Sequence, residues 1–180
     1  MRLISVCGSP RNGNTEWMLR HLNGLADSNG IETELILLRK LDIRACKGCL
    51  VCEKGGENRA GVCSIKDDMQ SIYPKLLSAD LIVFGTPVYF EMLSGLLKNF
   101  MDRTCPIWPR LEGKCFAGVA VAEEGIGSAV ENLKTYASVC SMKWAGCATA
   151  LAKNPRQVAK SGNITAELER LLADLKRAAV

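Results

Sequence analysis

The sequence contains a single histidine, His21, among 180 residues. A single histidine makes a nucleophile–histidine dyad or triad, as hydrolases use, an unfavoured interpretation. No pair of carboxylates is placed as general acid–base hydrolysis requires. We read His21 as a surface residue, and we expect any chemistry to belong to bound cofactors.

Long hydrophobic runs are also missing. No apolar run approaches the ~18 residues of a membrane span, and the apolar stretch before Gly8 is too short for a signal peptide. We therefore expect a cytoplasmic protein without a membrane partner. The formal net charge is only +4 and aromatic residues make up 6%, so neither a basic surface nor stacking platforms indicate a nucleic-acid partner.

Cysteine is the residue type in excess. There are nine, an odd number, in a chain that is 48% hydrophobic and long enough to build a core without disulfides. Thiols at close spacing in such a chain are more often ligands than bridges. The length predicts one domain over residues 1–180, with a cysteine-rich loop insertion at about 39–67.

Short β-rich runs alternate with segments of helical period. The runs predict strands over residues 3–7, 33–38, 80–85, 114–122 and 144–151, and helices over 15–28, 68–79, 93–103, 127–141 and 165–178. Such alternation predicts a doubly wound α/β fold, a parallel five-stranded sheet with helices on both faces.

The first strand runs directly into a loop and a helix. At the carboxyl edge of a parallel sheet, this arrangement is where such folds bind ligands. Glycines permit a close backbone approach, short polar side chains donate hydrogen bonds, and the helix start presents free N–H groups, which together suit a phosphate monoester. The alternative to a phosphate site is that Ser9, Asn14 and Thr15 only cap the helix. The loop residues are Gly8, Ser9, Arg11, Asn12, Gly13, Asn14 and Thr15.

Two further loops are predicted at the same edge. In the first, Pro87 holds Thr86 extended, so that peptide edges face a planar ring with an aromatic side chain against it. This loop comprises Thr86, Pro87, Val88, Tyr89 and Phe90, and the second, a flexible turn, includes Glu123 and Gly125. Loops suited to a phosphate, a ring face and a ring edge predict a flavin mononucleotide (FMN) site.

The segments GSPRNGNT and GTPVYFEMLSGLLKNFMDRT resemble the NAD(P)H-dependent FMN reductases and iron–sulfur flavoproteins of the flavodoxin-like superfamily. The resemblance covers roughly residues 1–150. It implies strand order 2-1-3-4-5, with Ser9, Arg11, Asn14 and Thr15 at the phosphate and residues 87–90 lining the isoalloxazine. It also implies a homodimer or homotetramer. Lys98 and Asp102 match the family's helix, and we interpret them as a surface ion pair.

A cysteine run stands in the predicted insertion. Cys46, Cys49 and Cys52 are three residues apart, and Cys63 follows after ten intervening residues, with a Gly55–Gly56 turn between. The run resembles the ligation pattern of bacterial ferredoxins and predicts a [4Fe–4S] site. Zinc, or thiols or a redox disulfide without metal, remain alternatives. Residues 39–67 carry seven Lys or Arg against four Asp or Glu, which would offset the cluster's negative charge.

The other five cysteines lack ligand spacing, and we read them as small core residues, with Cys105 the one to watch because it lies near the flavin loop.

The leading hypothesis is an iron–sulfur flavoprotein passing electrons between a [4Fe–4S] cluster and FMN, with a ferredoxin-type donor and a small-molecule acceptor. An NAD(P)H-dependent FMN, quinone or nitro reductase without a cluster is the alternative, NAD(P)H binding only transiently. A non-enzymatic electron carrier or a zinc-stabilised module is a third.

Overall fold

The computed structural model describes residues 1–54 and 63–179. Five parallel strands form its centre, as the apolar runs predict. They are β1 (Arg2–Cys7), β2 (Glu32–Leu37), β3 (Leu81–Tyr89), β5 (Cys115–Ala122) and β6 (Lys143–Leu151). Every residue of β5 is buried, which explains why its sequence is an almost continuous apolar run rather than an alternating one.

The strands pair in the order β2-β1-β3-β5-β6. Once the short β4 is set aside, this is the predicted order 2-1-3-4-5, so the flavodoxin-like fold is confirmed. Cys7 at the end of β1 pairs with Gly85 of β3, and Gly85 pairs with Val119 of β5. This register brings the loops that follow the three central strands to one edge of the sheet.

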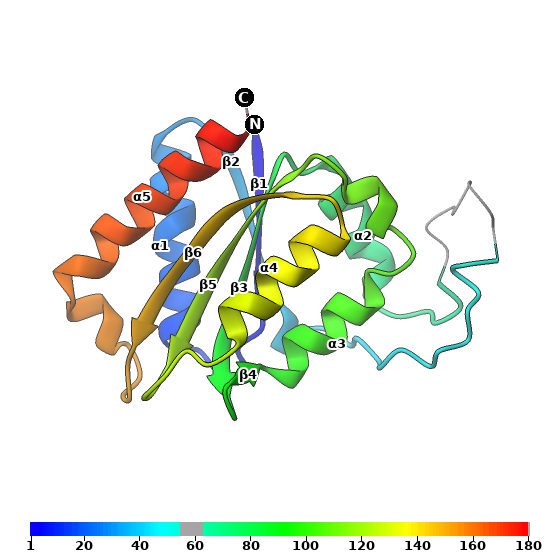
Figure 1. Cartoon of the computed structure of the whole chain (residues 1–180), viewed down its shortest axis with the longest axis horizontal. Coiled ribbons are helices and arrows are strands. Elements are labelled where there is room, and N and C mark those ends of the chain that lie inside the picture. Colours follow the sequence, from blue (N-terminus) through cyan, green and yellow to red (C-terminus); the bar gives the residue numbers. More distant parts are fainter. Residues whose placement is uncertain (55–62, 180) are drawn as a thin grey trace.

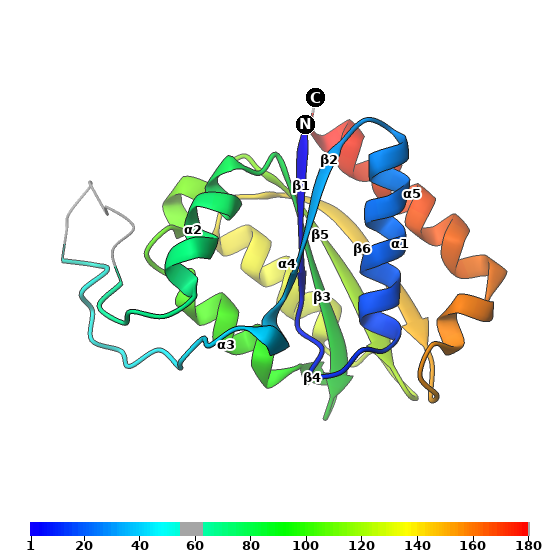
Figure 2. The same cartoon turned by 180° about the vertical axis from the view of Figure 1, so that it is seen from behind.

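Helices cover both faces of the sheet (Figures 1 and 2). On one face, α1 (Asn14–Ser28) and α5 (Gly162–Ala178) pack against it, and on the other lie α2 (Met69–Ser78), α3 (Gly95–Arg103) and α4 (Ala129–Val139). Each face has its own core cluster, centred on Leu19 and Leu168 on the first face and on Phe84 and Phe100 on the second. All five predicted helices are therefore present, within three residues of their expected bounds.

The end of β3 differs from the prediction. The strand continues four residues beyond Gly85, through Thr86 to Tyr89, and then turns back into β4 (Met92–Leu93), which pairs antiparallel with it. Phe90 and Glu91 form the turn with φ of 49° and 63°. Residues predicted as an open loop are thus a β-hairpin, and Pro87 is accommodated because the strand end tolerates a missing N–H.

Short 3₁₀ turns complete the fold: η1 (Leu38–Lys40), η2 (Trp108–Leu111) and η3 (Gln157–Lys160). Between η1 and α2 runs the cysteine segment, residues 41–54 and 63–68, which extends away from the α2–α3 side of the sheet (Figure 1). The predicted Gly55–Gly56 turn lies outside the described residues.

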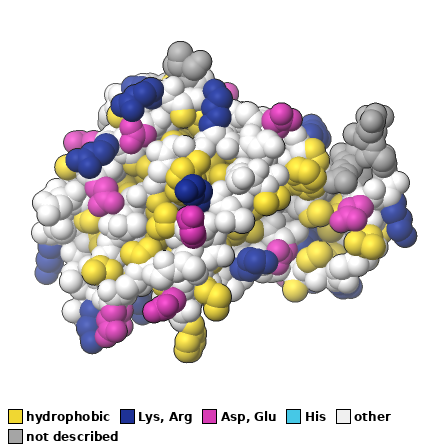
Figure 3. All heavy atoms as spheres, viewed as in Figure 1, with side chains coloured by type: hydrophobic (Ala, Val, Ile, Leu, Met, Phe, Trp, Pro, Cys, Tyr) yellow, Lys and Arg dark blue, Asp and Glu magenta, His cyan; other side chains and the backbone are white. Residues whose placement is uncertain are grey.

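The face seen in Figure 3 carries charges of both signs side by side, with hydrophobic side chains on the projecting segment. Exposed Leu50 and Val51 belong to that segment. The two ends of the chain lie together at the edge of the sheet opposite the β3–β4 hairpin (Figure 1). Within residues 1–54 and 63–179, no helix is both long and apolar enough to cross a membrane.

Candidate functional site

The loop after β1 is tied directly to the hairpin after β3. The Gly8 N–H donates to the Gly85 carbonyl over 2.8 Å, and the Ser94 hydroxyl donates to the Gly8 carbonyl over 2.7 Å. A Cβ on Gly8 would lie 2.6 Å from the Leu97 Cβ, so no larger residue fits without displacing α3. The two loops therefore form one rigid surface.

Ser9 holds the backbone of the predicted phosphate loop in place. Its hydroxyl, buried, donates to the Arg11 carbonyl over 2.8 Å and accepts from the Arg11 N–H over 3.3 Å. The side chains of Arg11 and Asn12 are exposed. The first helical hydrogen bond of α1 runs from Trp17 N–H to the Gly13 carbonyl, so the N–H groups at the helix start are free of helical partners, as an anion cradle requires.

Asn14 is engaged elsewhere than the sequence predicts. Its side-chain amide donates to the Asn154 carbonyl over 2.9 Å, and its oxygen accepts from the Val158 N–H at 3.4 Å. The side chain thus holds the loop after β6 against the start of α1. Thr15 stays within the cradle, 2% exposed, with its methyl group against Gly85.

A buried carboxylate lies beside the cradle. Glu16, 1% exposed, pairs with Arg39 at 2.7 Å and with Arg20 at 2.8 Å. Burial alone would raise the pKa of Glu16, but hydrogen bonds from the two guanidinium groups outweigh it and the pKa is lowered. The negative charge at the helix start is therefore ionised and compensated by two arginines.

The β3–β4 hairpin carries the predicted ring-binding residues. The buried Thr86 hydroxyl donates to the Pro87 carbonyl over 2.8 Å and accepts from the Ser94 N–H over 3.0 Å. Pro87 and Val88 are half-buried, whereas Tyr89 and Phe90 are 41% and 96% exposed. The peptide edges are thus fixed, while the two aromatic rings project from the edge of the sheet.

The third predicted loop is fixed at its end and open at its start. Ser128 donates from both its N–H and its hydroxyl to the Glu91 carbonyl, over 2.8 and 3.0 Å. Gly127 adopts φ of 52°, and a Cβ there would lie 2.4 Å from that carbonyl. Glu123 and Gly125 are exposed, and Glu123 pairs with Lys153 at 2.8 Å.

The four predicted thiol ligands line one cavity of about 130 Å³ between the cysteine segment and the end of α3. The cavity also contains a fifth thiol, Cys105, which the sequence prediction left among the core residues. The thiols that line it are Cys46, Cys49, Cys52, Cys63 and Cys105. Among residues 1–54 and 63–179, no group of three or more histidine, cysteine or acidic side chains is close enough together to hold a metal ion.

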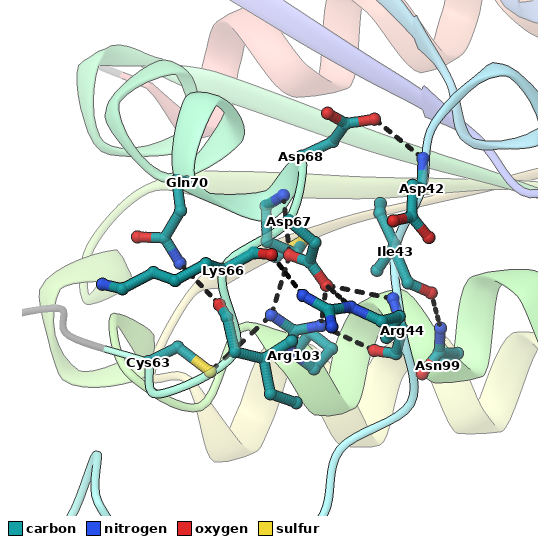
Figure 4. Close-up of polar contacts among 12 residues, drawn as sticks. Asp42, Ile43, Arg44, Cys63, Lys66, Asp67, Asp68, Gln70, Asn99 and Arg103 are labelled. Carbon is teal, nitrogen blue, oxygen red and sulfur yellow. Dashed lines mark hydrogen bonds and ion pairs between the residues drawn. The ribbon is translucent and has the colours of Figure 1, made fainter.

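A buried ion pair anchors one wall of this cavity (Figure 4). Arg103, 1% exposed, contacts Asp67, 0% exposed, with its Nη1 2.6 Å and its Nη2 3.0 Å from the two carboxylate oxygens. The same guanidinium donates to the Arg44 carbonyl over 2.6 Å and to the Cys63 sulfur over 3.6 Å. Arg103 therefore joins both arms of the cysteine segment to α3.

The thiols of the cavity differ in ionisation. A hydrogen bond with Ser64, at 3.1 Å, and then the Val51 backbone lower the pKa of Cys49. Burial, followed by the neighbouring Cys52, raises the pKa of Cys105 to about 11. At neutral pH the exposed Cys49 ionises the more readily, whereas Cys105 stays protonated.

Comparison with known proteins identifies the family. The family model for NADPH-dependent FMN reductase matches residues 1–155. The chain belongs to this family. The matched residues include the β1–α1 loop and the β3–β4 hairpin, which lie at the carboxyl edge of the sheet.

Two curated relatives carry the name iron–sulfur flavoprotein. One, from Archaeoglobus fulgidus, is 39% identical over 58% of this chain and 49% of its own length. The other, from Methanocaldococcus jannaschii, is 40% identical over 68% of this chain and 61% of its own length. The chain thus spans about half to three-fifths of these relatives. A solved archaeal flavodoxin shares the fold, with a TM-score of 0.67 at 16% identity, over 99% of each chain.

The residues fit the two groups that this family and these names suggest. Gly8 leaves no space for a side chain, and the start of α1 presents N–H groups, which is the donor set for the phosphate of FMN. Cys46, Cys49, Cys52 and Cys63 line one cavity, with the Arg103 guanidinium on the Cys63 sulfur, and thiols are the soft ligands that an iron–sulfur cluster uses. In the described residues these thiols are not gathered closely enough to hold a metal ion.

Several residues of the site have no local signal in the sequence. Asn154 and Val158 lie 140 and 144 positions from Asn14, and Arg103 lies 36 positions from Asp67. The Asp67–Asp68 pair reads locally as a helix start, which explains α2 but gives no hint of Arg103. The Lys98–Asp102 pair is present at 2.7 Å and exposed, so its interpretation as a surface ion pair is confirmed.

Proposed function

We propose that the chain is an FMN-dependent oxidoreductase of the iron–sulfur flavoprotein type. It would pass electrons between a [4Fe–4S] cluster on Cys46, Cys49, Cys52 and Cys63 and a bound FMN, and so reduce a small acceptor. The observation that carries the proposal is that these four thiols line a single cavity. The names of the two archaeal relatives support it.

In this proposal FMN occupies the carboxyl edge of the sheet. The N–H groups at the start of α1, with Ser9, Arg11, Asn12, Gly13 and Thr15, hold the phosphate, and Asn14 acts by fixing the neighbouring loop. Residues 86–90 line the ring system, and Glu123 and Gly125 lie beside it. The fixed Gly8–Ser94–Thr86 contacts support this assignment, because a rigid seat loses little entropy on binding.

When bound, the cluster supplies single electrons and FMN stores two, so the pair can join one-electron donors to two-electron acceptors. The chain's own part is to bind, position and compensate charge. Arg103 donates to the Cys63 sulfur, and a guanidinium at that distance stabilises negative charge on the ligand.

The remaining assignments follow from the same proposal. The chain would act as one domain with the cysteine segment as its insertion, take electrons from a ferredoxin-type protein and reduce a small molecule, with NAD(P)H as a transient alternative donor. A homodimer or homotetramer would cover the exposed apolar side chains of the hairpin, Tyr89, Phe90 and Met92, and those of Leu50 and Val51.

Metal and flavin analysis of the full chain, purified without oxygen, tests the proposal. We expect about four iron atoms and about one FMN per chain. Cys46→Ser should lose the iron and its visible absorbance while keeping FMN. Cys147→Ala, which alters a half-buried thiol on β6 outside the cavity, should keep both. A yellow chain without iron under these conditions contradicts the cluster assignment.

A second candidate is an NAD(P)H-dependent FMN, quinone or nitro reductase without a cluster. It is favoured by the spacing of the thiols, which within the described residues do not form a metal-binding group. This candidate predicts an iron-free chain that oxidises NADPH at a rate unchanged by Cys46→Ser. Loss of NADPH oxidation in that variant would argue against it.

A further inference from the structure

A thiol pair in the cysteine cavity links Cys52, the last residue of the Cys46–Cys49–Cys52 run, with Cys105, which lies outside that run. The Cys52 sulfur is 3.5 Å from the Cys105 sulfur, although the residues are 53 positions apart in the sequence. Both side chains are half-buried. In a disulfide the sulfurs are about 2.05 Å apart, so the two atoms need to approach by only about 1.5 Å.

The two residues differ in how firmly the chain holds them. Cys105 follows α3 directly: its N–H bonds to the Asp102 carbonyl at 3.4 Å, and the next turn closes from Ile107 N–H to the Thr104 carbonyl at 2.9 Å. The Thr104 hydroxyl donates to Met101 and contacts the Tyr136 hydroxyl. Cys105 is therefore fixed on the scaffold.

Cys52 lies instead in a turn of the projecting segment. The turn is held by Glu53 N–H to Leu50 carbonyl and Lys54 N–H to Val51 carbonyl bonds, at 3.0 and 3.4 Å. Leu50 and Val51 face solvent. Because this turn is exposed and Cys105 is fixed on the scaffold, we expect the small approach that a bridge requires to be made by Cys52.

We propose that Cys52 and Cys105 form a reversible intramolecular disulfide when the cavity holds no metal. The oxidant is a low-molecular-weight disulfide. One protein thiol attacks it and releases one small thiol, leaving a mixed disulfide; the second protein thiol then attacks the protein sulfur and releases the other. In total, two protein thiols become one disulfide and the small disulfide becomes two small thiols.

The bridge acts on the proposed cluster site, and this part of the inference rests on the proposed function. Cys52 is one of the four proposed ligands, and a sulfur in a disulfide is not available as a thiolate ligand. The oxidised chain should therefore accept no cluster until a reductant reopens the pair, which makes loading of the site dependent on the thiol–disulfide balance.

Peptide mapping of the metal-free full chain tests the bridge without any reference to the cluster. The chain is treated with chelator, incubated with oxidised glutathione, alkylated and digested with trypsin. Cys49 and Cys52 fall in the peptide 48–54, and Cys105 falls in the peptide 104–110. We expect these two peptides to be joined, with the link lost after reduction.

Three single variants show which thiols are bridged, and two of them change the two cysteines of peptide 48–54. Cys49→Ser should keep the link, while Cys52→Ser and Cys105→Ser should lose it. A link that persists in Cys52→Ser, or a wild-type chain in which both cysteines are alkylated after oxidation, overturns the inference.

Iron loading then separates the bridge from the cluster. With ferrous iron and sulfide, oxidised wild-type chain should take up less than about one-tenth of the iron taken up by reduced chain, and Cys105→Ser should load equally in both states. If the bridge maps as expected and reduced chain binds no iron, the proposed function fails and the disulfide stands. If oxidised and reduced wild type load equally, the regulatory role of the pair is wrong.

Discussion

The two candidate sites of this protein are built in opposite ways. At the carboxyl edge of the sheet, Gly8, Thr86 and Ser94 are joined by hydrogen bonds of 2.7–3.0 Å between segments far apart in the sequence. The cysteine segment is exposed over much of its length and is attached to the scaffold around Arg103. The fold itself shapes the first site, whereas the second is held to α3 by Arg103 and by a hydrogen bond from Asn99 to the Ile43 carbonyl, and depends on what the thiols bind.

The largest expected effect comes from removing the anchor that Arg103 forms with Asp67. Asp67→Asn leaves the buried Arg103 charge without its partner, and breaking a buried pair costs about 3–5 kcal/mol. Urea unfolding should show this loss in the free energy of unfolding. Asp102→Asn breaks the exposed pair with Lys98 and should cost less than about 1 kcal/mol. Equal losses in the two variants would remove the special role of the buried pair.

Acid should weaken the same anchor. Burial alone would raise the pKa of Asp67, but hydrogen bonds from Arg103 and from the Arg44 and Met69 amides outweigh it, and the pKa is lowered. A carboxyl whose pKa is lower in the folded than in the unfolded chain stabilises the fold above about pH 4, and this contribution disappears as the pH falls through the folded pKa.

Unfolding experiments between about pH 3 and pH 7 measure this contribution. The wild-type free energy of unfolding should fall more steeply on acidification than that of Asp67→Asn, because the variant lacks the titrating carboxyl. Glu16 also has a lowered pKa, so only the difference between the two proteins reports on Asp67. Parallel curves would show that Asp67 contributes nothing to the acid sensitivity.

At the carboxyl edge, Thr15→Val tests the phosphate cradle. The change removes the hydroxyl and keeps the methyl group that packs on Gly85. A lost hydrogen bond to a charged group costs about 1.5–3 kcal/mol, so the Kd for FMN should rise about ten-fold to a hundred-fold. Riboflavin lacks the phosphate and its Kd should not change. An equal weakening for both ligands would place Thr15 away from the phosphate.

The smallest effect concerns glycines. Gly8→Ala forces a Cβ to 2.6 Å from Leu97, and such overpacking costs about 1–3 kcal/mol. In Gly24→Ala, on the exposed side of α1, the new Cβ meets nothing within 4 Å, and the change should stabilise the chain by about 0.5–1 kcal/mol. Thermal unfolding of the two variants compares them. Tolerance of alanine at position 8 would show that the edge is less rigid than its contacts indicate.

The sequence predicts the sheet because each central strand is a nearly unbroken apolar run between glycines and polar residues. It does not predict the extension of β3 to Tyr89, since Pro87 and two exposed residues interrupt the apolar pattern there. The two-residue β4 is too short for any period to be detected. Long-range packing against α4, through Glu91 and Ser128, fixes the hairpin.

For the sites, spacing along the chain finds the residue types but not their partners. The Cys46–Cys49–Cys52 run is visible locally, and Cys63 follows from its proximity. Cys105 is brought to Cys52 only by the course of α3, 53 positions away. Asn14 shows the reverse case, because a residue suited to a phosphate loop is used to hold the loop at Asn154.

Met1 accepts a hydrogen bond from Glu32, and the Ala178 carbonyl accepts one from Lys143, both at the amino ends of strands. A peptide handle joined to either end of the chain would therefore emerge on the side away from the hairpin. Immobilised on an electrode or a sensor chip through such a handle, the molecule would present the hairpin edge of its sheet, the proposed FMN site, to the bulk solution, open to electron carriers arriving by diffusion.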